Sequence, residues 1–371
     1  MKLYLVAGEA SGDARGTELM HALREQIPDV QFLGAGGREM KAFAGDAIFD
    51  WADEAVVGLW DVLKKYGYFR KQFHRMLAEV EAAKPDALIT IDYPGFNMRL
   101  AKEAKRRMPK LRTIHYISPQ VWAWHRGRIP KMAKFLDLML CLFPFEIPLY
   151  ADAGLRAVCV GHPLLDSLAA KRSGQPRDPS LVALLPGSRS KEVRKIFPVM
   201  VETAVRLKSA RPSLRFEAAA ASEALAEEMK AALRTHGCHD DFCIVTLRTA
   251  QSLMQRAAVG MVCSGTATLE STFFGLPMVI LYKVAWLTWA VGKRLVKIPF
   301  LGLPNVLAGR EIAGEFLQDA AQPGLIANEV LRLLEDSAFR ETQQRAQADV
   351  VASLGEPGAA KRAACAIAAT P

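Results

Sequence analysis

Short apolar runs alternate with charged, helix-prone segments along most of the chain, and this alternation constrains the fold more than any other feature. In the first half the apolar runs are followed by glycine-containing turns, and they occupy residues 3–7, 31–33, 87–91, 113–117 and 136–142. Strands that alternate with helices form βαβ units, which build parallel sheets covered by helices. The pattern therefore predicts the α/β class.

A polar segment rich in glycine and proline interrupts the alternation at residues 171–179. The apolar runs then restart at residues 181–185, 215–220, 243–245, 260–263 and 278–282. A length of 371 residues suits about two domains. We therefore predict two Rossmann-like domains, over residues 1–170 and 180–342, joined by a linker at 171–179 and followed by a helical tail at 343–371. In such sheets ligands bind beyond the carboxyl ends of the strands, so we expect the two sheets to face an interdomain cleft.

The charge balance favours anionic partners, because 48 Lys and Arg face 39 Asp and Glu, a net charge of +9. Nucleic acid, anionic lipid headgroups and phosphorylated substrates all remain open on charge alone. The six cysteines form no CxxC pair, which favours a reducing compartment. The N-terminal segment lacks signal-peptide features, and no stretch reaches about 18 uninterrupted apolar residues. We expect a cytoplasmic protein that touches a membrane, with no metal site, because no DxD or HxxxH set is present.

The turn after the first apolar run contains two glycines and two carboxylates, at residues 8–13. Glycines allow a close approach of the backbone to a ligand, and an acidic loop suits sugar hydroxyls better than a pyrophosphate. We therefore predict that Glu9, Ser11 and Asp13 line an acceptor site. The alternative is that Ser11 or Asp13 only caps the following helix.

Asp92 follows the run at 87–91, where a carboxylate points beyond the carboxyl end of a strand. Glycosyl transfer to a hydroxyl needs a base, and a partly desolvated carboxylate can serve. We predict Asp92 as that base, with Asn97 beside the acceptor; an Asx-turn before Pro94 is the alternative. Trp122 and Trp124 follow the next run and suggest a lipid or sugar wall, or cation–π packing within the fold.

Two turns in the second half combine glycine, hydroxyl groups and a helix start. The first contains Gly187, Ser188 and Arg189, and the second contains Ser264, Gly265 and Thr266. Helix N-termini and an Arg fork suit the diphosphate of a nucleotide sugar. Glu270, about one turn into the second helix, could receive two ribose hydroxyls. The alternatives are an ordinary turn with a solvated Arg189 and a helix-dipole role for Glu270.

Two amphipathic segments mix aromatic, aliphatic and basic residues. Together they favour a membrane interface or contact with acyl chains, although each alone is also typical of a buried helix. The residues that we predict to face acyl chains are Val56, Leu59, Trp60, Leu63, Trp286 and Trp289.

Six motifs occur in the order found in one bacterial family. They are residues 8–13 (GEASGD), 92–97 (DYPGFN), 118–124 (SPQVWAW), 185–189 (LPGSR), 264–270 (SGTATLE) and 303–311 (LPNVLAGRE). From about residue 2 to about residue 322 the chain thereby resembles the lipid-A-disaccharide synthases, inverting glycosyltransferases of GT-B architecture.

The resemblance implies transfer of 2,3-diacylglucosamine from its UDP derivative to the 6-hydroxyl of 2,3-diacylglucosamine 1-phosphate, without a cofactor. By position, Asp92 matches the candidate base, Arg189 a diphosphate contact and Glu270 a ribose carboxylate. Asn305, Arg310 and Glu311 match a donor-side loop. The family also implies peripheral attachment to the cytoplasmic face of the inner membrane, and a homodimer that exchanges its C-terminal segment.

Two other interpretations differ from this one. Another GT-B enzyme, an epimerase or a peptidoglycan glucosaminyltransferase, would not need two basic, aromatic segments. A nucleotide- or RNA-binding module without chemistry would gather its positive charge along one groove, whereas the basic residues here lie beside tryptophans and on helical surfaces. We therefore expect no nucleic-acid partner.

Overall fold

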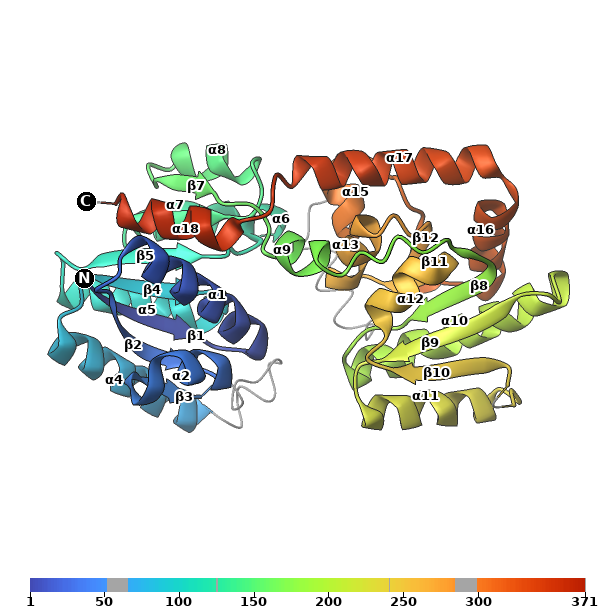
Figure 1. Ribbon diagram of the computed structural model, residues 1–371, viewed down its shortest axis with the longest axis horizontal. Coiled ribbons are helices and arrows are strands. Elements are labelled where there is room, and N and C mark those ends of the chain that lie inside the picture. Colours follow the sequence, from blue (N-terminus) through green and yellow to red (C-terminus); the bar gives the residue numbers. More distant parts are fainter. Residues whose placement is uncertain (52–65, 125, 240, 284–298, 371) are drawn as a thin grey trace. The chain divides into compact units, whose positions relative to one another are not determined.

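The computed structural model describes residues 1–51, 66–124, 126–239, 241–283 and 299–370. The chain forms two compact units (Figure 1). Unit 1 contains Met1–Asp166 together with Glu356–Pro371, and unit 2 contains Ser167–Gly355.

Unit 1 is built on a sheet of parallel strands in the order β3-β2-β1-β4-β5-β6-β7. The strand order reverses direction between β1 and β4, which is where open α/β sheets bind ligands. The strands are β1 (Lys2–Ala7), β2 (Gln31–Gly36), β3 (Ile48–Asp50), β4 (Ala87–Ile91), β5 (Arg112–Tyr116), β6 (Leu138–Cys141) and β7 (Ala157–Cys159).

Helices cover both faces of this sheet, because alternate residues of each strand are apolar on both sides. Leu3 and Leu5 of β1 face one core with α1 and α18, whereas Tyr4 and Val6 face a second core with α4 and α5. The helices of unit 1 are α1 (Ala10–Gln26), α2 (Arg38–Ala44), α4 (Tyr66–Ala83), α5 (Pro94–Arg107), α6 (Val121–Trp124), α7 (Ile129–Met132), α8 (Glu146–Ala151) and α18 (Ala359–Ala368), and α9 (Leu164–Ala169) crosses into unit 2.

Unit 2 repeats this architecture with parallel strands in the order β10-β9-β8-β11-β12-β13. Its order reverses between β8 and β11. The strands are β8 (Asp178–Leu185), β9 (Arg215–Ala220), β10 (Cys243–Leu247), β11 (Ala257–Cys263), β12 (Met278–Tyr282) and β13 (Glu315–Leu317). The helices are α10 (Ser190–Ala210), α11 (Glu223–Thr235), α12 (Ala250–Arg256), α13 (Thr266–Phe273), α15 (Leu303–Ala308), α16 (Pro323–Glu335) and α17 (Ser337–Ser353).

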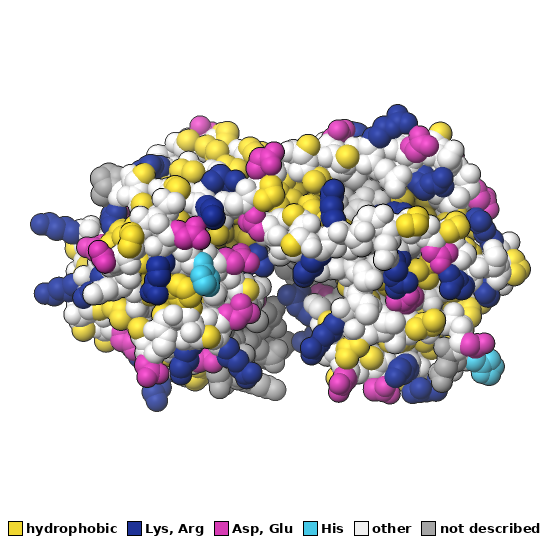
Figure 2. Space-filling model, viewed as in Figure 1, with side chains coloured by type: hydrophobic (Ala, Val, Ile, Leu, Met, Phe, Trp, Pro, Cys, Tyr) yellow, Lys and Arg dark blue, Asp and Glu magenta, His cyan; other side chains and the backbone are white. Residues whose placement is uncertain are grey.

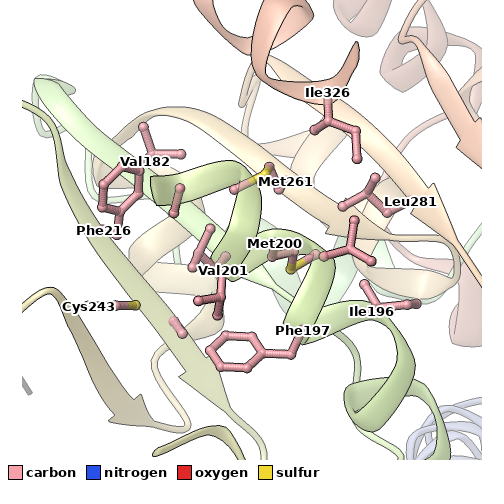
Figure 3. Close-up of a cluster of buried hydrophobic side chains, with 14 of the residues drawn as sticks. Val182, Ile196, Phe197, Met200, Val201, Phe216, Cys243, Met261, Leu281 and Ile326 are labelled. Carbon is pink, nitrogen blue, oxygen red and sulfur yellow. The ribbon is translucent and has the colours of Figure 1, made fainter. Parts of the chain in front are cut away.

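The larger core of unit 2 lies between its sheet and the helices α10, α11 and α16. Figure 3 shows Phe197 and Met200 of α10 in one cluster with strand residues such as Met261. The side chains of Phe197 and Met200 are fully buried. Burying a side chain of this size contributes about 1.5–3 kcal/mol, so α10 is held against the sheet by its apolar face. This core fixes the start of α10, which borders the candidate site described below.

The chain returns to unit 1 at its C-terminal end. Helix α17 contacts α13, α15 and α16 in unit 2, whereas α18 lies along α1 in unit 1 (Figure 1). Ala363, Ala364 and Ile367 of α18 are fully buried in the core that includes α1. Asp166 accepts hydrogen bonds from the first backbone N–H groups of the α18 segment, at Gly358 and Ala359. The C-terminal tail is therefore shared between the two units.

The segment 171–179, expected as a linker, lies within unit 2, after the boundary between the units at residue 166. Arg177 is tied to unit 2 because its guanidinium donates to the carbonyl oxygens of Met254, Ala257 and Phe274. Burial lowers the pKa of Arg177 to about 10. The polar residues of this segment thus bind backbone carbonyls at the ends of neighbouring elements.

Candidate functional site

A pocket of about 540 Å³ in unit 2 lies at the point where its strand order reverses. Strands β8 and β11 pair in parallel, with Leu185 opposite Val262, so the turns that follow them meet at one edge of the sheet. The pocket brings together seven residues that were predicted to bind a donor: Gly187, Ser188, Arg189, Ser264, Gly265, Thr266 and Glu270.

Glycines make both turns possible. Gly187 has a φ of +104° and Gly265 a φ of +150°, values that side-chain-bearing residues rarely adopt. Directly after these turns, α10 begins at Ser190 and α13 begins at Thr266. The first N–H groups of a helix have no partner within the helix and favour anions. The turns thus present two helix N-termini to the same pocket.

Charged and amide side chains complete the pocket wall. The Arg189 side chain is 62 % exposed, and its Nη1 lies 3.1 Å from Oε1 of Glu192. The Glu270 carboxylate accepts a hydrogen bond of 3.0 Å from Nε2 of Gln251. That bond holds one carboxylate oxygen of Glu270 and orients the other.

Three further polar residues that we did not predict line the same pocket: Glu192, Arg248 and Gln251. Arg248 follows β10 and has a φ of +58°, and its backbone N–H donates to the carbonyl oxygen of Ala220 at 2.8 Å. Its position at the carboxyl end of β10 could have indicated that Arg248 lines the pocket, but no glycine or helix-capping motif marks that turn. Glu192 and Gln251 lie inside helices, where polar residues are common and carry no distinctive signal.

The loop expected on the donor side does not line this pocket. Asn305 is fully buried, and its amide is engaged on both sides: it donates to the Ala313 carbonyl and the Glu315 carboxylate, and it accepts from the N–H groups of Ile312 and Ala313. Arg310 and Glu311 are exposed. The structure thus assigns Asn305 to the support of its own loop, whereas the donor-side roles of Arg310 and Glu311 stay predictions.

Asp92 lies at the corresponding edge of unit 1, where β1 and β4 pair with Ala7 opposite Ile91. Asp92 and Tyr93 have φ values of +48° and +46°, which is an uncommon and strained conformation for residues other than glycine. Burial raises the pKa of the Asp92 carboxyl, and a hydrogen bond from the Tyr93 backbone partly opposes this shift. A carboxylate with a raised pKa is suited to accept a proton near neutral pH.

Asn97 stabilises the turn that contains Asp92 and Tyr93. It is fully buried, and its Nδ2 donates to the carbonyl oxygens of Ile91 at 3.0 Å and Asp92 at 2.7 Å. These bonds hold the two carbonyls that end β4. The structure therefore makes Asn97 a support for Asp92, and a direct contact between its amide and an acceptor does not fit its burial.

Asp13 also has a structural role. It is 5 % exposed, and its carboxylate accepts hydrogen bonds from the N–H groups of Gly37, Glu39 and Met40 at the start of α2. This corrects its assignment to an acceptor site, and it also differs from the predicted alternative, because the helix that Asp13 caps is α2 and not α1.

Glu9 and Ser11 fit the acceptor assignment better. Ser11 is exposed at the start of α1. Burial, followed by the nearby charge of Glu9, raises the pKa of the Tyr93 hydroxyl, so the Glu9 carboxylate lies near Tyr93. Gly8 makes room for this arrangement, because a Cβ there would lie 2.4 Å from the Tyr93 ring.

The turn after β5 is anchored by a buried carboxylate. Glu146 is 1 % exposed and accepts hydrogen bonds from the Ser118 hydroxyl and from the backbone N–H groups of Leu142 and Phe143. Burial raises the pKa of Glu146. The Trp122 ring is 7 % exposed and meets the exposed Phe145 ring edge-on at 5.2 Å. Trp122 thus forms the inner part of an aromatic surface, with Phe145 outside it.

Several predicted residues fall outside the part of the chain that the structure describes. These are Val56, Leu59, Trp60, Leu63, Trp286 and Trp289, together with the side chain of Trp124. Among the helices that are described, none is long and apolar enough to cross a membrane. Within the same described ranges, no group of three or more His, Cys, Asp or Glu side chains could hold a metal ion.

Comparison with known proteins gives one consistent family. Residues 3–370 match the family model described as "Lipid-A-disaccharide synthetase". A lipid-A-disaccharide synthase of Geobacter metallireducens is 38 % identical over 371 residues, which covers 98 % of this chain and 95 % of that protein. A lipid-A-disaccharide synthase of Pseudomonas aeruginosa is 41 % identical over 348 residues, covering 91 % and 90 %.

Solved structures share the fold at much lower sequence identity. The structure of a putative UDP-N-acetylglucosamine 2-epimerase from Listeria monocytogenes superposes with a TM-score of 0.64 at 13 % identity, and the match covers 99 % of this chain and 95 % of that one. The calicheamicin glycosyltransferase CalG4 superposes with a TM-score of 0.56 at 14 % identity, covering 100 % and 98 %. At such identities the likeness concerns the arrangement of two Rossmann-like domains and not the reaction.

Proposed function

The chain belongs to the lipid-A-disaccharide synthetase family, and from this premise we propose how its residues carry out a hexosyl transfer of lipid A biosynthesis. The donor is UDP-2,3-diacylglucosamine and the acceptor is 2,3-diacylglucosamine 1-phosphate. The acceptor 6-hydroxyl oxygen forms a bond to the anomeric carbon, the bond from that carbon to the UDP oxygen breaks, and the configuration inverts. The products are the β-1,6-linked lipid A disaccharide 1-phosphate, UDP and a proton.

The observation that carries the donor assignment is the unit 2 pocket, where the two predicted turns meet. The Gly187–Ser188 and Ser264–Thr266 turns would place backbone N–H groups around the diphosphate, and Arg189 would bind it through charge-assisted hydrogen bonds. Negative charge grows on the diphosphate as the sugar leaves, so the same contacts would stabilise the transition state. Glu270, oriented by Gln251, would accept hydrogen bonds from the ribose hydroxyls.

Asp92 would act as the general base. Its raised pKa and its place beyond β4 support this role, because the carboxylate must take the proton of the 6-hydroxyl as the new bond forms. Asn97 would hold the turn in place, and Glu9 and Ser11 on the neighbouring turn would contact acceptor hydroxyls. The aromatic surface of Trp122 and Phe145 would border the acceptor on the other side.

We also propose that the protein associates peripherally with the cytoplasmic face of the inner membrane. The two substrates carry acyl chains, and the net charge of +9 favours an anionic surface. Figure 2 shows Lys and Arg side chains interspersed with Asp and Glu on the displayed face of each unit, a distribution that gives no support to a nucleic-acid groove. Co-sedimentation with anionic and with zwitterionic vesicles tests the membrane proposal. If the protein is absent from the pellets of both kinds of vesicle, the proposal is contradicted.

A homodimer that exchanges the C-terminal segment is the second assembly proposal. Helix α18 docks through small buried residues, and Gly355 and Gly358, with φ values of +84° and +104°, precede it. The same contacts would form if α18 docked on a second copy. Light scattering on the purified protein would then give twice the mass of one chain, and a single-chain mass at all concentrations would contradict exchange.

The decisive experiment is incubation of the purified protein with UDP-2,3-diacylglucosamine and 2,3-diacylglucosamine 1-phosphate, followed by mass spectrometry. We expect a disaccharide 1-phosphate and stoichiometric UDP. Release of UDP without disaccharide would indicate hydrolysis only, and an unchanged donor would reject the substrate assignment. Omitting the acceptor provides the control for hydrolysis.

A further inference from the structure

Glu192 forms an ion pair with the Arg189 guanidinium, the group that we assign to the diphosphate. Its Oε1 lies 3.1 Å from Nη1 of Arg189, and Glu192 itself lines the unit 2 pocket. The pocket that we assign to a dianionic diphosphate thus contains a carboxylate that is paired with Arg189. Electrostatically, that carboxylate opposes the ligand for which the pocket is otherwise suited.

The second carboxylate oxygen of Glu192 points toward the other turn residues. A Cβ on Gly187 would lie 2.7 Å from Glu192 Oε2 and 3.4 Å from the Cys263 sulfur. Glu192 and Cys263 therefore both lie close to Gly187 in the turn after β8. Burial, and next the charge of Glu192, raises the pKa of the Cys263 thiol to about 12, which is consistent with a carboxylate whose field reaches the pocket wall.

We propose that Glu192 is a positioning residue that competes with the diphosphate for Arg189 and thereby promotes the release of UDP. In the empty pocket Glu192 holds the guanidinium close to the Gly187 turn. When the donor binds, the diphosphate takes over N–H groups of Arg189 while remaining in the field of the Glu192 carboxylate. This inference rests on the proposed donor site and goes beyond it, because it assigns a function to repulsion within the site.

The exchange is physically inexpensive because Arg189 is largely exposed. Exposed ion pairs contribute little to the stability of a fold, so a diphosphate with several oxygens can displace the carboxylate from Arg189. The repulsion between the two anions persists after that displacement. UDP therefore binds less tightly than the hydrogen-bond donors of the pocket alone would allow. Weaker binding of this product favours its release and hence turnover.

The test is the substitution Glu192→Gln in the full-length protein, with UDP as the titrant in calorimetry. Loss of the negative charge is expected to tighten UDP binding by about three- to tenfold, as removal of a partly screened repulsion should. The KM for the donor falls in parallel, and kcat does not rise. A residue with a merely structural role would weaken binding when replaced, so the direction of the change separates the two.

Two variants control for charge and for fold. Glu228→Gln is closely matched, because Glu228 pairs with Arg194 at the same 3.1 Å and with similar exposure, yet it does not line the pocket. It should leave UDP affinity unchanged. Glu192→Asp keeps the charge and should not tighten UDP binding.

Each outcome decides between the proposals. Unchanged or weaker UDP binding by Glu192→Gln, or equal tightening by Glu228→Gln, overturns the role of Glu192. Arg189→Ala tests the proposed donor site separately: if it leaves UDP affinity unchanged, the diphosphate assignment itself fails. If Arg189→Ala weakens binding but Glu192→Gln does not tighten it, only the competition fails.

Discussion

The backbone N–H of Asp92 donates a hydrogen bond to the carbonyl oxygen of Tyr116 at 2.9 Å. This bond continues the pairing of β4 with β5 one residue beyond the end of β4, although Asp92 has left the extended conformation. The Asn97 amide holds the Asp92 carbonyl from the other side. The backbone of Asp92 is therefore fixed at both of its polar groups, and its carboxylate accepts a hydrogen bond from the Tyr93 backbone.

Replacement of this carboxylate by an amide should abolish transfer. Asp92→Asn retains the shape of the side chain but cannot accept the hydroxyl proton, so we expect kcat to fall by about 10²- to 10⁴-fold. UDP binding should survive, because the unit 2 pocket is built without Asp92. Disaccharide formation and calorimetry with UDP measure the two effects; lost UDP binding with an intact fold would move Asp92 to the donor side.

The thermal stability of Asp92→Asn provides the control for folding. Burial raises the pKa of Asp92 in the folded state, so the folded protein binds its proton more tightly than the unfolded chain does. Ionisation above that pKa therefore costs folding free energy, and the amide avoids this cost. We expect the variant to melt at neutral pH at the same temperature as the unaltered protein or higher. A clearly lower Tm would mean that the carboxylate stabilises the turn.

The pH dependence of transfer follows from the same shift. As a base, Asp92 is active only when ionised, so kcat/KM should fall as the pH drops through its raised pKa. The acidic limb of the profile should therefore lie above the ordinary aspartate value of about 3.9. A profile measured with substrates at low concentration checks this, and a limb at or below the ordinary value would exclude Asp92 as the titrating group.

Arg189→Ala should weaken UDP binding by about ten- to a hundredfold, the usual effect of losing a hydrogen bond to a charged group. Stability should change little, because the Arg189 side chain is largely exposed. Arg194→Ala is the matched control on the same helix, since it removes an Arg–Glu pair outside the pocket. Similar losses of affinity in both variants would point to a general effect of charge.

Asp13→Ala should destabilise unit 1 by about 1–3 kcal/mol, because three backbone N–H groups would lose their acceptor. Ser11→Ala, two residues earlier on an exposed position, should leave the Tm unchanged and raise the KM for the acceptor if Ser11 contacts it. Thermal denaturation and acceptor titrations separate the two residues. A Tm unaffected by Asp13→Ala would contradict the capping role.

Glu146→Ala should lower stability by about 2–4 kcal/mol, since the Ser118 hydroxyl and two backbone N–H groups would lose a buried acceptor. Glu146→Gln keeps one acceptor oxygen and should recover part of that loss. If the turn containing Ser118 borders the acceptor, acceptor KM should rise in the alanine variant while UDP affinity stays constant. Denaturant unfolding and steady-state kinetics measure these effects.

The sequence alone determined the α/β class and most of the strands. Ten apolar runs coincide with β1, β2, β4, β5, β6, β8, β9, β10, β11 and β12, because buried parallel strands are nearly continuous in apolar residues. It missed the three-residue strands β3, β7 and β13, which are too short to show a periodic pattern. The turns with Gly187 and Gly265 were identifiable for a local reason, since glycine and a following helix start are visible in the sequence.

Only the tertiary structure decided what the polar residues of those turns do. Asp13, Asn97 and Asn305 have the same chemical groups as a ligand site, but their partners are backbone groups of the fold. Those of Asp13 lie on another helix, and those of Asn97 and Asn305 lie in the adjoining turn or loop. Conversely, Glu192, Arg248 and Gln251 carry no motif and reach the pocket only because β8, β10 and β11 end at one edge of a sheet. A motif shows which local conformation a turn adopts. Whether a polar side chain of that turn binds the fold or is left for a ligand depends on how the neighbouring backbone groups are arranged in three dimensions.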